Sequence, residues 1–94
     1  MAFQDFPRLY RDTAGATAVN APVWIVSVTL TPAAAASVLV VKDNATTLLT
    51  LQAAASGSSV VWHCGGYPVK CATSLVTTLS GAAAEYTITY CTAL

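Results

Sequence analysis

A run of nine residues, VWIVSVTLT at positions 23–31, constrains the fold of this chain more than any other feature. Its even-numbered residues, Trp24, Val26, Val28 and Leu30, fall on one side of an extended chain. From position 25 onward, the odd-numbered residues of the other side are one Ile followed by Ser and Thr. This alternation of β-branched and aromatic residues with polar ones predicts a strand with one buried face.

Similar short runs follow, separated by residues that favour turns. We expect further strands at residues 37–42, 46–53, 59–63, 72–79 and 85–92. The alanines at 33–36 are too few to hold a helix, so they are interpreted as a loop. Six short strands with turn residues between them predict an all-β fold, a small six-stranded antiparallel sandwich or barrel over residues 22–94. The runs at 23–31 and 85–92 are the most regular, and we expect them to lie in the core and to pair.

Residues 1–21 differ in composition and predict an extended N-terminal arm. Phe3, Phe6, Leu9 and Tyr10 are interspersed with charged residues, and a run of small residues follows. One interpretation is a loose terminus, as is common for chain ends that are not docked. The other is an arm whose aromatic and aliphatic side chains become ordered on a neighbouring subunit, which makes these four residues candidate interaction residues.

Charge is sparse in this chain. Four basic and four acidic residues make up 9% of the sequence, with a net charge of zero, whereas an average soluble domain has about 25% charged residues. An uncharged surface favours self-association, and the apolar runs SVLVV and TTLLTL suggest that a second copy covers one of their faces. There is no basic stripe for nucleic acid, no apolar segment typical of a membrane span and no signal peptide, so we expect neither nucleic acid nor membrane as a partner.

His63, Cys64, Cys71 and Cys91 are the residues best suited to chemistry. Six residues separate Cys64 from Cys71, which is longer than the usual spacing of paired zinc ligands. A disulfide between these two cysteines is geometrically easier, and reduced apolar thiols are the third alternative. His63 and Cys64 are adjacent, so they point to opposite faces of a strand and cannot form a thiolate–imidazole pair. We therefore expect no enzyme, no metal site and no cofactor.

Five aromatic residues lie in or beside the expected strands. Trp24, Tyr86 and Tyr90 fall on the apolar sides of their strands, which indicates core packing. Trp62 and Tyr67 flank the Gly-Gly loop and form the one expected exposed pair. They are therefore two further candidate interaction residues, suited to a glycan or a protein.

The order of the segments from the first strand onward resembles small β-proteins of tailed bacteriophages. In these proteins a segment of the form V-L-V-x-D-…-L-L-x-L-x-A-A-A-G-x-x-V leads into a Gly-Gly loop. The chains end in G-L-x-x-x-x-S-G-x-A-x-x-T-V-x-Y. The corresponding residues here are 38–43, 48–54, 57–61, 65–66, 75–81 and 86–90. The hairpin after residue 43 is short in this chain, the three cysteines depart from the pattern, and the arm is not covered.

The resemblance implies an accessory virion protein of the capsid decoration, or cement, type. Such a protein would be made in the host cytoplasm, bind the major capsid protein at the outer surface of the virion and stabilise contacts between capsomers. It would bind copies of itself, as a homotrimer in our expectation, and would need no cofactor. The alternatives are a tail or head-fibre component and a carbohydrate-binding β-module.

Overall fold

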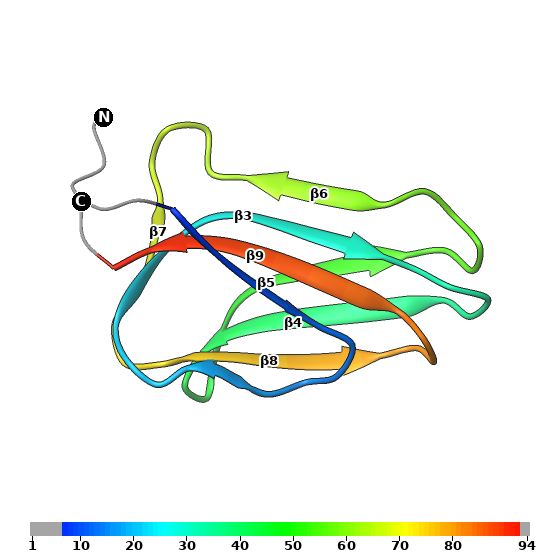
Figure 1. Cartoon of the computed structure of the whole chain (residues 1–94), viewed down its shortest axis with the longest axis horizontal. Helices are drawn as coiled ribbons and strands as arrows, with labels where there is room; N and C mark the ends of the chain where they lie inside the picture. The colour runs from blue at the N-terminus through cyan, green and yellow to red at the C-terminus, as the bar shows by residue number, and fades with distance from the viewer. Residues whose placement is uncertain (1–6, 93–94) are drawn as a thin grey trace.

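The chain folds into two antiparallel β-sheets (Figure 1). The computed structural model describes residues 7–92, and within this range it contains nine strands and no helix. The strands are β1 (Arg8–Asp12), β2 (Thr17–Val19), β3 (Val23–Thr31), β4 (Ser37–Asp43), β5 (Thr46–Ala53), β6 (Val60–His63), β7 (Val69–Cys71), β8 (Leu75–Ser80) and β9 (Glu85–Cys91). Sheet A has the order β1-β9-β3-β6, with β7 also paired to β3, and sheet B has the order β2-β8-β4-β5. The all-β prediction is confirmed, but the predicted count of six strands is not.

Several strands lie where the sequence predicts them. The bounds of β3 and β5 coincide with the predicted strands at 23–31 and 46–53, and the alanines at 33–36 form a loop. The predicted pairing of the first and last of these strands is confirmed, since β3 pairs with β9 from Trp24↔Cys91 to Thr31↔Glu85. Alternation in these segments is strong because one face of each packs on the core.

The core lies between the sheets and consists mainly of branched aliphatic side chains. Residues 1% exposed or less come from β3, β4, β7, β8 and β9 and from the turn before β9. They are Val23, Ile25, Val28, Leu30, Leu39, Val41, Cys71, Leu75, Tyr86, Ile88 and Cys91, together with Ser37 and Ala84. Val38 and Val40 alternate with the buried residues of β4 and are half-buried, because β4 lies between β5 and β8.

A bulge in β3 changes which residues face the core. The pairing with β9 shifts between Ile25 and Ser27, where Val26 is the extra residue. Ile25 and Val28 are therefore both fully buried although they are three positions apart. The prediction that Trp24 shares the buried side of Val28 is wrong, because the bulge turns it to the opposite face. Trp24 is half-buried there, with Lys70 Nζ 4.4 Å from its ring centroid.

The predicted N-terminal arm over residues 1–21 is not confirmed. β1 pairs with β9 along the edge of sheet A, and β2 pairs with β8 at the edge of sheet B. The chain crosses between the sheets at residues 13–16, where Ala16 and Thr77 exchange two backbone hydrogen bonds. Gly15 permits this approach, because a Cβ there would lie 2.8 Å from the carbonyl oxygen of Thr77. The charged residues of β1 hid this strand in the sequence. Its conformation is decided by its pairing with β9 rather than by its own residue pattern.

The predicted strand at 72–79 is also displaced. The observed β8 begins at Leu75, and the preceding loop contains the additional strand β7, which pairs with the first residues of β3. Residues between β7 and β8 form a turn held by the side chain of Asp43, as described below. The strand therefore starts after this turn.

A buried hydroxyl group joins the two sheets at the crossing of the chain. Tyr86 on β9 is 1% exposed, and its hydroxyl donates a hydrogen bond to the carbonyl oxygen of Ala14 at 2.9 Å. The same hydroxyl lies 2.6 Å from the hydroxyl of Thr77 on β8. Tyr10 packs its ring beside that of Tyr86, with centroids 6.1 Å apart. Tyr86 on β9 thus contacts β8, the segment after β1 and the ring of Tyr10 on β1.

Replacing Tyr86 with Phe is expected to lower the free energy of unfolding by about 1–3 kcal/mol, because the carbonyl of Ala14 and the hydroxyl of Thr77 lose a buried partner. Urea unfolding followed by circular dichroism measures this. Tyr67→Phe is the matched control, since Tyr67 is 78% exposed, and it should change stability by less than about 0.5 kcal/mol. Equal effects of the two substitutions would contradict this role of Tyr86.

Candidate functional site

The side of sheet A that faces away from the core carries an array of hydroxyl groups. Ser27 and Thr29 of β3 lie directly opposite Thr89 and Thr87 of β9, and Thr31 lies opposite Glu85. Residues directly opposite each other in antiparallel strands share a face. The residues between them on both strands are buried, so these hydroxyl side chains point outward. We call Ser27, Thr29, Thr31, Thr87 and Thr89 the hydroxyl face.

Two exposed aliphatic side chains flank the hydroxyl face. Leu9 on β1 lies opposite Thr89 and is 70% exposed, and Val61 on β6 lies opposite Thr29 and is 63% exposed. One ion pair lies at the rim, where Arg11 Nη2 is 2.7 Å from Glu85 Oε2. The described part of this face is therefore a row of hydroxyl and aliphatic groups across four strands. Arg11 and Glu85 pair at its rim, His63 of β6 lies opposite Ser27, and Lys70 lies beside Trp24.

The candidate interaction residues of the N-terminal segment have different positions. Phe3 and Phe6 lie outside the described residues. Leu9 lies on the outer face of sheet A, as stated above. Tyr10 lies on the opposite face of β1, opposite Ile88, and donates a hydrogen bond to Asp12 Oδ2 at 2.7 Å. Tyr10 thus contributes to the core rather than to the outer surface.

Trp62 and Tyr67 do not share an environment. Trp62 lies opposite Val28, a fully buried residue, so its side chain points toward the core, where it is half-buried. Tyr67 follows Gly65 and Gly66, which both have positive φ, and is 78% exposed. The expected exposed aromatic pair therefore reduces to Tyr67.

None of the three cysteines, Cys64, Cys71 and Cys91, takes part in a disulfide. His63 accepts a hydrogen bond at Nδ1 from the backbone N–H of Gly65 at 3.1 Å. Within residues 7–92 there is no group of three or more His, Cys, Asp or Glu side chains that could hold a metal ion.

Asp43 holds the turn between β7 and β8. Its carboxylate accepts hydrogen bonds from the backbone N–H groups of Ala72 at 3.0 Å and Thr73 at 2.9 Å. These bonds hold the pKa of Asp43 below its usual value. The thiol of Cys71 donates to the carbonyl of Ser74 at 3.0 Å, and its burial, together with the nearby Asp43, raises its pKa to about 11. Cys71 is therefore a protonated structural thiol at neutral pH.

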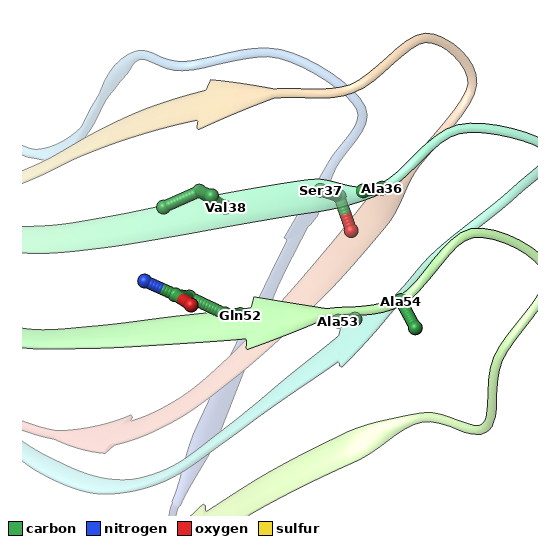
Figure 2. A pocket seen from close by; sticks show the side chains of 6 residues that line it. All are labelled: Ala36, Ser37, Val38, Gln52, Ala53 and Ala54. Carbon is green, nitrogen blue, oxygen red and sulfur yellow. The ribbon is translucent and has the colours of Figure 1, made fainter.

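An open cavity of about 410 Å³ lies between the first residues of β4 and the last residues of β5 (Figure 2). Its lining consists of small or uncharged residues: Ala36, Ser37, Val38, Gln52, Ala53 and Ala54. Ser37 is 1% exposed, and its hydroxyl has no hydrogen-bond partner among the described residues. In Figure 2 this oxygen is directed toward the end of β5.

Comparison with protein-family models, with curated proteins and with solved structures finds no match for this chain. Within residues 7–92 there is also no helix long and apolar enough to cross a membrane. The functional proposal therefore depends on the sequence and on the geometry of the described surfaces.

Sequence reasoning identified Leu9 but not the hydroxyl face. The signal was present as Thr-x-Thr at 29–31 and at 87–89, on the side of each strand assigned to solvent. The alternation alone could not show that β3 and β9 align these residues in register. That alignment follows from the pairing of Thr29 with Thr87 and of Ser27 with Thr89.

Asp43→Asn should flatten the dependence of stability on pH. The folded pKa of Asp43 lies below its ordinary value of 3.8, so its stabilising effect is present above that value and is lost as pH falls through the lowered pKa. Urea unfolding between about pH 6 and about pH 2 measures the slope. Asp12, whose pKa is lowered by its hydrogen bond from Tyr10, keeps part of the slope in both proteins. A slope as steep in Asp43→Asn as in the wild type would contradict the role of Asp43.

Proposed function

We propose that this chain is a decoration, or cement, protein of a tailed-bacteriophage capsid, which binds the outer shell and stabilises contacts between capsomers. The observation that carries the proposal is the hydroxyl face with Leu9 and Val61 at its flanks. Together they offer a surface of mainly hydroxyl and aliphatic groups on a small β-fold. The sequence resemblance described above points to the same role.

The physical basis is the low free-energy cost of burying such a surface against a protein partner. Hydroxyl groups lose less solvation on burial than charged groups, and they can exchange hydrogen bonds with water for bonds to a partner. Leu9 and Val61 add apolar area that becomes buried. Each interface is modest, but many copies on one shell act together to stabilise it.

Two alternatives have less support. A carbohydrate-binding module would need an aromatic platform, and the packing of Trp62 toward the core leaves Tyr67 without that partner. A tail or head-fibre component could use the same neutral surface, and the number of copies per particle distinguishes it from a cement protein. The homotrimer suggested by the resemblance stays a prediction.

Thr29→Lys should reduce attachment to the shell by at least about tenfold, because an unpaired ammonium group buried at the interface costs more than about 1.4 kcal/mol. The assay adds purified protein to particles of the encoding phage that lack it, and measures attached copies after sedimentation. Thr78→Lys is the matched control, since Thr78 lies on the outer side of sheet B.

The control variant should attach as the wild type does. Equal attachment of both variants would exclude the hydroxyl face as the contact surface. Failure of the wild-type protein to attach would contradict the proposed function.

A further inference from the structure

The first part of the described chain runs along one edge of each sheet in turn. β1 pairs with β9 and β2 pairs with β8, and each is the end strand of its sheet. In Figure 1 this segment is the blue chain that follows β9 and then turns back beside β8. We call residues 8–19 the strap, because one continuous segment covers an edge of both sheets.

The strap contributes little to the core. Every residue of the described chain that is 1% exposed or less lies at position 23 or later. None of residues 8–19 is buried, and the half-buried ones are Tyr10, Asp12, Ala16, Ala18 and Val19. Segments with few buried apolar side chains open at a lower free energy than the core does. The strap can therefore separate from the sheets with little loss of buried apolar area.

The bonds that hold the two halves of the strap meet at residues 13–16, where the chain crosses between the sheets. The carbonyl of Ala14 accepts a hydrogen bond from the hydroxyl of Tyr86 at 2.9 Å, and Ala16 exchanges two backbone hydrogen bonds with Thr77. The hydroxyl groups of Tyr86 and Thr77 lie 2.6 Å apart. Because this short crossing joins β1 directly to β2, loss of these bonds frees both strands together.

Two further side-chain contacts hold the strap only weakly. The ion pair between Arg11 and Glu85 is exposed to solvent, and such pairs contribute little to stability. The hydroxyl of Tyr10 donates to Asp12 at 2.7 Å. This second bond lies within the strap, so it persists when the strap leaves the sheets.

The strap also differs in charge from the strand that it covers in sheet A. β1 carries Arg8, Arg11 and Asp12, whereas residues 86–91 of β9 carry no charge. Charged side chains on an edge strand discourage pairing with other chains. With the strap in place, sheet A therefore ends in a charged edge, and without the strap it would end in an uncharged one.

We propose that the strap opens as one unit while the rest of both sheets stays folded, and that it shields the edges of β9 and β8. Opening would also remove Leu9 and Arg11 from the outer side of sheet A, because both belong to β1. The hydroxyl groups of β3 and β9 would stay in place, since the strap takes no part in the pairing of these two strands. This opening does not depend on the proposed function.

Hydrogen exchange of the free wild-type protein, followed by NMR at a series of low urea concentrations, tests the opening. We expect the protected amides of β1 and β2 to exchange through one common opening, at least about tenfold faster than the central amides of β3 and β4. Alternate amides of β9 donate to β1 and to β3. Those that donate to β1 should exchange with the strap, and those that donate to β3 should stay protected.

Gly15→Ala should loosen the strap selectively. A Cβ at Gly15 would lie 2.8 Å from the carbonyl oxygen of Thr77 and 3.1 Å from Cα of Thr78, so the crossing must move away from β8. The strap amides should then exchange at least about tenfold faster than in the wild type, while β3 and β4 stay protected. Circular dichroism checks that the variant is folded.

Gly57→Ala is the matched control. A Cβ at Gly57 would lie 3.0 Å from the carbonyl oxygen of Ala54, within the loop after β5 and outside the strap. Because the strap opens while this loop stays folded, strap exchange in this variant should match the wild type.

Exchange of the strap amides at the rate of β3, through global unfolding alone, would overturn this proposal. Separate openings of β1 and β2 would also overturn it, because the crossing would then not join them. Equal acceleration of strap exchange by Gly15→Ala and Gly57→Ala would contradict it as well. All of these measurements use the free protein, so they leave the proposed function to its own test of attachment.

Discussion

The fold depends on β3, which pairs along its length with β9 on one side and with β6 and β7 on the other. The bulge at Val26 lets both halves of this strand face the core, with Val23 and Ile25 buried before it and Val28 and Leu30 buried after it. A straight strand would direct one of these two halves to solvent. β7 pairs with β3 before the bulge, and β6 pairs with β3 after it. The bulge also brings Trp24 to the outer side beside Lys70.

The charged groups of sheet A lie around the hydroxyl face. Arg11 and Glu85 pair at its rim, and Lys70 lies beside Trp24 on the same side of the sheet. Asp43 is engaged by the turn before β8. In the proposed role the hydroxyl and aliphatic groups at the centre of this side would contact the shell.

The sequence located two strands to the residue. Val23–Thr31 was identified by its alternation and Thr46–Ala53 by an apolar run bounded by turn residues. β1, β2 and β7 were missed, since short strands take their conformation from partners that the local sequence does not reveal. The direction of Trp62 was also missed. Its position beside a Gly-Gly loop suggested exposure, whereas its register opposite Val28 turns it inward. Thr29 and Thr87 were assigned to solvent, but their alignment needed the pairing of two strands more than fifty residues apart.

The central claim is that this protein covers a shell in many copies, and the most direct measurement is its abundance in the virion. Quantitative mass spectrometry of purified particles of the encoding phage gives its copy number relative to the major capsid protein. The account predicts a ratio near one to one, or a simple fraction of it set by the symmetry of the shell. A handful of copies per particle would contradict the account and assign the protein to the tail, neck or fibre.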